Sequence, residues 1–182
     1  MVFTMDKPWY QRLFSPAPAA APDSSGTRTK AEQGDADAQF DLGMNYGNGT
    51  GELLDFVQAA EWYRRAAEQN HSLAQFNLGV MYAKGQGVAQ DDAEAARWMH
   101  KAADRGDAGA QFHLGTRYHR ASIRPEQTDA AESRVEAFKW FQLAAAQGYK
   151  DSIASRDSVT RGMTREEVAE GNQRATRFVP QN

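Results

Sequence analysis

The sequence contains no cysteine in 182 residues. A chain without cysteine cannot form disulfides, use a thiolate nucleophile, hold an iron–sulfur cluster or bind zinc through sulfur. A lipid anchor attached through cysteine is excluded for the same reason. Hydrophobic residues still make up 41% of the chain, which is ordinary for a globular protein. We therefore expect a folded domain without covalent cross-links.

The sequence also lacks an excess of positive charge. Its 21 Lys and Arg residues face 24 Asp and Glu residues, for a net charge of -3, whereas nucleic-acid-binding domains are usually strongly basic, so we expect no nucleic-acid partner. No segment approaches the ~18 consecutive apolar residues of a membrane span. Residues 1–22 lack the apolar core of a secretory signal. We expect no membrane span and a cytoplasmic location.

Catalytic and metal-binding motifs are missing as well. The four histidines (His71, His100, His113 and His119) include no pair at the i, i+4 spacing and no His-Glu-x-x-His string. The glycine-rich stretch 47–51 follows a predicted helix rather than a strand, and it lacks the Lys-Ser/Thr ending of a phosphate-binding loop. The sequence therefore predicts no catalytic residue, no metal site and no cofactor.

What the sequence does contain is an internal repeat. The tripeptide Ala-Gln-Phe occurs at 38–40, 74–76 and 110–112, so successive copies begin 36 residues apart. Leu-Gly, a tyrosine, a tryptophan and an Ala-Ala pair follow in the same order in each copy, and the tryptophan of the third copy comes six residues late. Because so many positions recur in phase, the sequence predicts three copies of one structural unit.

Each copy predicts two helices. In the first copy Ala38, Leu42 and Tyr46 share one face of a helix over about 36–46. Gly43 lies beside Leu42, where the missing side chain would let a neighbouring helix approach closely.

Glycines after the first helix predict left-handed helix ends, namely Gly47, Gly49 and Gly51 in copy one and Gly85 and Gly87 in copy two. Capping boxes predict where later helices start, with Asp55, Asp91 and Ser133 beginning the second helix of each copy and Thr164, with Glu167, beginning the final helix.

These motifs resemble the Sel-one-like repeat, a relative of the tetratricopeptide repeat. The resemblance rests on Ala-x-Ala-Gln-x-x-Leu-Gly-x-x-Tyr (36–46), Gly-x-Gly-Val (85–88) and Ala-x-x-Trp-x-x-Lys-Ala-Ala (95–103). It implies an all-α fold, a right-handed α-solenoid of three helix-turn-helix repeats (34–69, 70–105 and 106–147, within 27–147) with N- and C-terminal capping helices. The third copy departs from the pattern, because Ala121 and Ile123 stand where glycines are expected and its loop is longer and rich in arginine.

The two ends of the chain carry different signals. Residues 27–33 predict a half-helix before the first repeat, and residues 148–182 resemble the helical cap of many bacterial members. A thin apolar stripe in the final helix fits packing on one side only: Val168, Gly171, Ala175 and Phe178. Residues 1–26 predict a flexible tail with a short amphipathic segment (6–14) and a Pro/Ala linker. That segment caps the first repeat, docks into another protein or is disordered.

The resemblance also implies where a partner binds. In tetratricopeptide-type stacks the first helices line a concave groove, and the residues that this places in the groove are Phe40, Met44, Phe76, Asn77, Val80, Lys84, Phe112, His113, Thr116 and Arg120. The three phenylalanines would form a ladder for apolar side chains of a peptide. Alternatively, each phenylalanine packs on the second helix of the preceding unit.

Charge is distributed unevenly along the copies. Residues 34–69 hold seven acids against two arginines, a net charge of -5, and copy three adds Arg117, Arg120, Arg124 and Arg134. This asymmetry would orient a charged partner, or it is a solvated surface of uneven charge.

We therefore expect a scaffold or adaptor that holds a protein or peptide in its groove, and not an enzyme. The alternative is a dedicated inhibitor, an immunity protein that blocks a toxin or effector. The sequence identifies neither the partner nor the oligomeric state.

Overall fold

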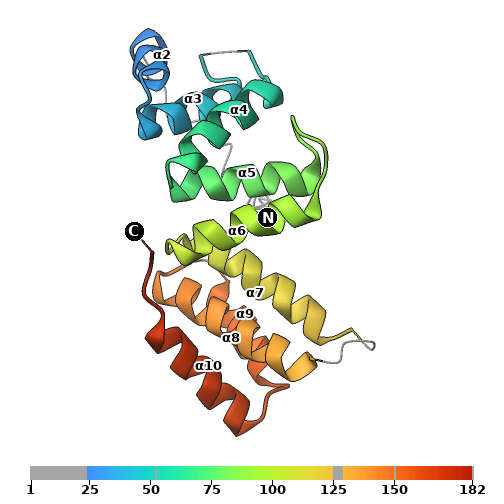
Figure 1. Cartoon of the computed structure of the whole chain (residues 1–182). Coiled ribbons are helices and arrows are strands. Elements are labelled where there is room, and N and C mark those ends of the chain that lie inside the picture. Colours follow the sequence, from blue (N-terminus) through green and yellow to red (C-terminus); the bar gives the residue numbers. More distant parts are fainter. Residues whose placement is uncertain (1–23, 52, 125–128, 150, 182) are drawn as a thin grey trace, which may run out of the picture. The chain divides into compact units, whose positions relative to one another are not determined.

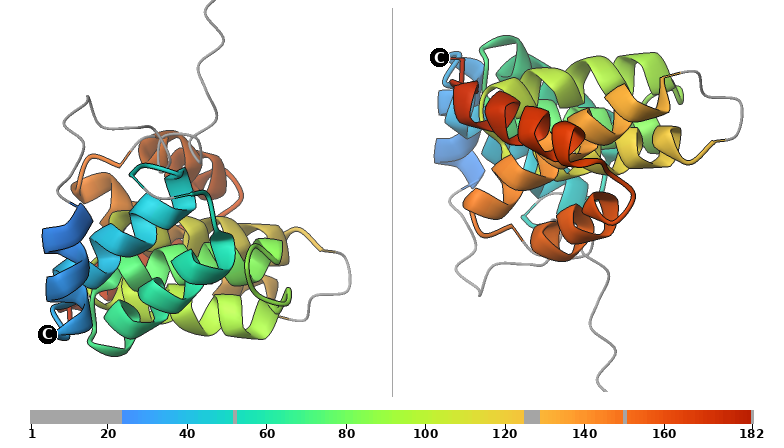
Figure 2. Two further views of the ribbon diagram at one scale, coloured as in Figure 1. Left: turned by 90° about the horizontal axis from the view of Figure 1, so that it is seen from above. Right: turned by 90° about the horizontal axis from the view of Figure 1, so that it is seen from below.

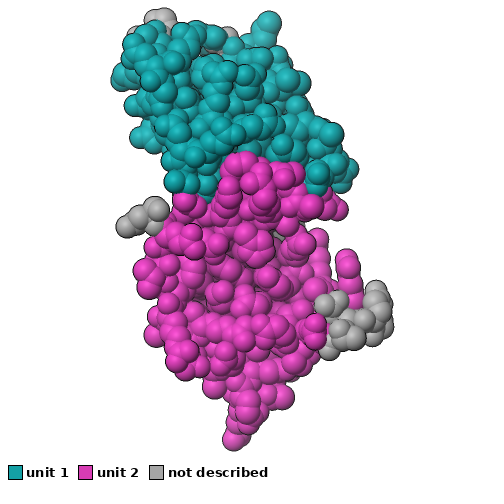
Figure 3. Space-filling model, viewed as in Figure 1, with its two compact units in different colours: residues 1–91 teal, residues 92–182 magenta. Residues whose placement is uncertain are grey.

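The computed structural model describes residues 24–51, 53–124, 129–149 and 151–181. Over these residues the chain forms nine helices and no strand, which confirms the all-α helical-repeat prediction. The predicted amphipathic segment 6–14 lies outside the described residues. The chain divides into two compact units, 1–91 and 92–182 (Figure 3). The boundary between the units falls inside the second predicted repeat.

The first unit contains four described helices, which follow one another in the blue-to-green part of Figure 1: α2 (Ser24–Glu32), α3 (Ala36–Asn48), α4 (Phe56–Glu68) and α5 (Ser72–Lys84). Each helix packs on the next one in the chain. The apolar faces of the first three meet in a buried cluster of Ala31, Ala38, Leu42 and Trp62, with Tyr46 at its edge. The predicted helical face of copy one is therefore confirmed.

The second unit contains five helices: α6 (Asp92–Asp104), α7 (Ala108–Ser122), α8 (Ala130–Ala146), α9 (Ser152–Thr160) and α10 (Arg165–Arg177). α8 is central, because it contacts α7, α9 and α10, and Figure 2 shows α10 alongside it. A cluster of buried residues from α8 and α9 forms part of the core: Ala137, Phe138, Phe141 and Val159.

Three of the four predicted helix starts are confirmed and one is wrong. α6 begins at Asp92, directly after Asp91. The carboxylate of Asp55 accepts the backbone N–H groups of Val57 and Gln58 at the start of α4. Thr164 begins α10 with a complete capping box. Ser133, in contrast, is buried inside α8, which begins at Ala130. The residues before Ser133 are Ala, Ala and Glu, which favour helix and extend α8 by one turn towards the N-terminus.

The predicted left-handed glycines are confirmed at Gly49, Gly51, Gly85 and Gly87, and the prediction for Gly47 is wrong. Gly49 and Gly85 end α3 and α5 in the left-handed conformation, with φ of 67° and 65°. Gly47 is still within α3. α7 has no such glycine: it ends at Ser122, is followed by Ile123 with φ of -101°, and runs for 15 residues where α3 and α5 run for 13.

The C-terminal cap packs on one side, as its thin apolar stripe predicts. Gly171 lies so close to the ring of Phe138 that a Cβ built on the glycine would come within 2.6 Å of it. The ring of Phe178 meets that of Trp140 edge-on, with centroids 5.8 Å apart.

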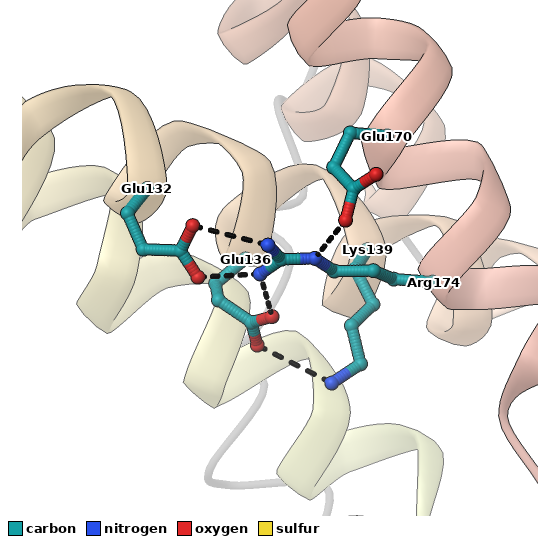
Figure 4. Close-up of polar contacts among 5 residues, drawn as sticks. All are labelled: Glu132, Glu136, Lys139, Glu170 and Arg174. Carbon is teal, nitrogen blue, oxygen red and sulfur yellow. Dashed lines mark hydrogen bonds and ion pairs between the residues drawn. The ribbon is translucent and has the colours of Figure 1, made fainter.

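Polar contacts complete this cap. Figure 4 shows the Arg174 guanidinium, from α10, between the carboxylates of Glu132 and Glu136 on α8. Its Nε also donates to Glu170 on its own helix at 2.8 Å. Charge-assisted, forked hydrogen bonds of this kind fix orientation, so they set the position of α10 against α8.

Candidate protein-binding site

The first helix of each repeat starts with the same cap. Asp35, His71 and Asp107 accept the backbone N–H three residues on, at 2.8, 3.2 and 2.7 Å. In His71 the acceptor is Nδ1, and Nε2 lies 3.3 Å from a carboxylate oxygen of Asp37. A neutral imidazole can accept at one nitrogen and donate at the other, so His71 takes the place that an aspartate holds in the other copies.

A buried glutamine then ties each first helix to the helix before it. The side-chain amides of Gln39, Gln75 and Gln111 donate to the carbonyls of Ala31, Ala67 and Ala103, respectively. These carbonyls lie at helix C-termini, where intrahelical partners run out. The sequence analysis assigned no role to this glutamine, although its recurrence in Ala-Gln-Phe was the signal that could have revealed it.

Close helix packing explains the glycine of Leu-Gly. A Cβ on Gly43 would lie 2.7 Å from the ring of Tyr63, and one on Gly115 would lie 2.6 Å from the ring of Phe141. Real Cβ atoms do not approach so closely, so the predicted role of Gly43 is confirmed.

Burial strongly raises the pKa of the Tyr63 hydroxyl, which hydrogen-bonds to Asn77.

The three phenylalanines of the proposed ladder take part in this packing. Phe40 stacks on His71, with ring centroids 4.6 Å apart. Phe112 lies 5.4 Å from both Phe141 and Tyr149. Phe76 is only 2% exposed. Phe40 and Phe112 are half-buried, and they contact the second helix of their own repeat or the segment after it rather than the second helix of the preceding repeat. Phe76 has little surface to offer a partner.

The other predicted groove residues differ in exposure. Val80 and Asn77 are buried, whereas Met44 and Thr116 are half-buried and Lys84 and Arg120 are exposed. The Thr116 hydroxyl donates to the Phe112 carbonyl within α7.

His113 is half-buried beside Phe112, with ring centroids 6.4 Å apart. Because Phe76, Asn77 and Val80 are buried, fewer of the predicted groove residues can contact a partner than the sequence suggested.

Charge on the first helices changes from copy to copy. α3 carries Asp37 and Asp41 and no basic residue, α5 carries Lys84 and no acid, and α7 carries Arg117 and Arg120 and no acid. Partial burial and the nearby Asp37 carboxylate raise the pKa of Asp41. The first unit thus presents an acidic first helix and the second unit a basic one.

A shallow pocket of about 380 Å³ lies within the first unit, and sequence reasoning missed it. It forms between α4 and the segment after α5, with Val57, Arg64 and Val88 among its lining residues. Gly87 makes it possible, because a Cβ there would lie 2.0 Å from the Phe56 carbonyl oxygen. Arg64 is partly engaged, since it donates to the Tyr82 hydroxyl at 3.1 Å.

The histidines do not assemble into a reactive group. His71 caps α5, and burial lowers the pKa of His100, which lies edge-on to Tyr118 and Trp140. Within the described ranges no three His, Asp or Glu side chains are placed to hold a metal ion. None of the helices that can be described there is long and apolar enough to cross a membrane.

Comparison with known proteins identifies the repeat. The Sel1 repeat model matches residues 36–71, 72–107 and 108–149, which together cover more than half of the chain. The chain belongs to the Sel1 repeat family. Proteins of this family generally mediate protein–protein interactions and are typically non-catalytic. A comparison with curated proteins found no significant match.

Two solved structures share the fold of this Sel1 repeat chain. One is a protective antigen present in uropathogenic Escherichia coli strains, which displays an SLR fold; it is 32% identical over 85% of this chain, with a TM-score of 0.71. This chain covers 32% of that antigen, so it spans about a third of its length. The other is a Sel1 repeat protein from Oxalobacter formigenes, 35% identical over 75% of this chain and 98% of that one, with a TM-score of 0.64.

Proposed function

We propose that this Sel1 repeat protein is a scaffold or adaptor that binds a protein or peptide on the outward faces of its first helices, α3 and α5 in one unit and α7 in the other. One contrast carries the proposal. The residues that recur in the repeats are used for packing and capping, whereas the outward charges differ in every copy. Packing needs no such variation, but selective recognition of a partner does.

Site-specific photo-crosslinking tests this proposal. A photoreactive residue at Met44 or Thr116 would report on the first helices, and the same residue at the exposed Arg65 on α4 or Lys101 on α6 is the matched control on second helices. We expect the same partner to crosslink in cells from Met44 and Thr116 but not from the controls. Crosslinks that form only from Arg65 and Lys101 would contradict the proposed face.

The same experiment separates an adaptor from a dedicated inhibitor such as an immunity protein. Several partners that dissociate as salt rises support the adaptor. One stoichiometric partner that survives high salt supports the inhibitor. Affinity of the purified complex, measured by calorimetry, decides between them because dedicated inhibitors reach the nanomolar range or tighter.

A further inference from the structure

The outward face of α7 and the segment just after it carry three arginines that pair with no carboxylate of the described residues. Arg117 and Arg120 lie three residues apart on one side of α7, and Arg124 follows in the segment just past the helix, which ends at Ser122. All three are exposed, and no ion pair to any of them occurs among the residues that the structure describes. The backbone turn continues past the helix, since the N–H of Arg124 donates to the Ala121 carbonyl.

Several other cations of the second unit lie beside carboxylates. Four other basic side chains each pair with a carboxylate: Arg134, Lys139, Arg156 and Arg174. α7 itself contains no acidic residue, and the sequence has none between Asp107 and Glu126. Like charges at these spacings repel one another, although Arg120, in the last turn of α7, is stabilised by the helix dipole.

The chemistry of the stripe selects its ligand. Arginine presents a planar fork of donors that matches a carboxylate and keeps its charge at any physiological pH. Arg117 and Arg120 lie about one helical turn apart, roughly 5 Å along the axis, a length that an extended peptide covers in about two residues. Ile123 is 68% exposed beside the stripe, so an apolar side chain of the ligand has a surface to cover.

We propose that the α7 arginine stripe, Arg117, Arg120 and Arg124, is the docking site for an acidic segment of the partner protein. This inference rests on the proposed function and names the chemistry of the partner at one helix. Charge complementarity fixes the occupant as a run of Asp or Glu residues interspersed with apolar residues.

The test measures binding of a fluorescent oligoglutamate peptide to the full chain at low salt by fluorescence anisotropy. Arg117→Glu with Arg120→Glu is the test variant, and Arg165→Glu with Arg177→Glu is the matched control, because both control arginines are exposed on α10 and the net charge changes equally. We expect the test variant to bind about tenfold more weakly or not at all, and the control to stay within about twofold of wild type. Thermal melts followed by circular dichroism confirm that both variants fold.

Three outcomes would overturn the inference. Equal losses in both variants would mean that the peptide responds only to net charge. Tighter binding of single-stranded RNA than of oligoglutamate would mean a nucleic-acid site. A cellular partner that crosslinks from Thr116 and is insensitive to Arg117→Glu with Arg120→Glu would remove the stripe but leave the proposed function standing.

Discussion

The first and third repeats pack by the same rule and present opposite charges. In each, a glycine of the first helix lies against an aromatic ring of the second, Gly43 against Tyr63 and Gly115 against Phe141. α3 is nevertheless acidic and α7 basic. The packing residues therefore recur between the two repeats, whereas the charges of their solvent-facing residues differ.

The largest effects should come from the repeated tryptophans. Trp140 is 3% exposed and also contacts Phe178 of the C-terminal cap, whereas Trp62 is 6% exposed and is covered on one side by Arg65. We expect Trp140→Ala and Trp62→Ala each to lower the free energy of unfolding by about 3–5 kcal/mol, with Trp140→Ala the more damaging. Urea unfolding followed by circular dichroism measures the free energy of unfolding. A loss below about 1 kcal/mol in either variant would contradict the burial of that tryptophan in the core of its unit.

Gly43 and Gly115 test whether the two helices of the first repeat and those of the third repeat pack equally closely. Gly43→Ala and Gly115→Ala insert a methyl group against Tyr63 and Phe141, and we expect each to cost about 1–3 kcal/mol of stability. Gly162→Ala is the control, because its Cβ would meet no atom closer than 3.7 Å. Gly43→Ala and Gly115→Ala variants as stable as the control would show that the helices can separate without cost.

Arg174 tests how strongly the C-terminal cap is held. Arg174→Gln removes the charge shared by Glu132, Glu136 and Glu170, and we expect a loss of about 1–2 kcal/mol that shrinks as salt is added. Arg65→Gln breaks an exposed pair with Glu61 and the contact of the guanidinium with the Trp62 ring, both on α4, and should cost about 1 kcal/mol or less. Equal losses would mean that the cap gains nothing from its forked contacts.

The equivalent position of the repeat holds Arg64 in the first unit and His100 in the second, and this difference should affect how stability depends on pH. Arg64 donates to Tyr82 in the first unit, and 36 residues later His100 faces Tyr118. Burial is the main cause that lowers the pKa of His100; Asp104, Arg117, Glu136 and Lys139 also act on it.

Because the pKa of His100 is lower in the folded protein than in the unfolded chain, the unfolded chain binds a proton at His100 at a higher pH than the folded protein does. This contribution to stability is complete above the unfolded value of about 6.5 and decreases as pH falls below it. We expect His100→Arg to remove that decrease, an effect below about 1 kcal/mol, in urea unfolding between pH 5 and 8. Identical slopes against pH in wild type and His100→Arg would contradict the assignment.

Most of the fold could be predicted from the sequence because the repeat makes each position visible three times. Gly43, Asp55 and Thr164 have the roles that their spacing indicates. Ser133 does not, because the insertion before it changed which residue begins α8. The helix propensity of the residues before Ser133 sets the start of α8, and a search for capping motifs alone does not detect this propensity.

The candidate site was harder to predict. Phe76 and Val80 are buried although the family resemblance placed them in a groove. A large apolar residue fits a core and a binding surface equally well, so its position in the repeat cannot separate the two. The charges of α3 and α7 were visible in the sequence, but only the structure shows which arginines already have partners.

The buried glutamines have a consequence for how such chains grow. Each donates to a carbonyl eight residues earlier, Gln39 to Ala31, Gln75 to Ala67 and Gln111 to Ala103. The joint between successive helix pairs is therefore encoded locally. A gene duplication that copies any complete 36-residue period carries its own joint along, so the protein can be lengthened by whole modules without new compensating mutations.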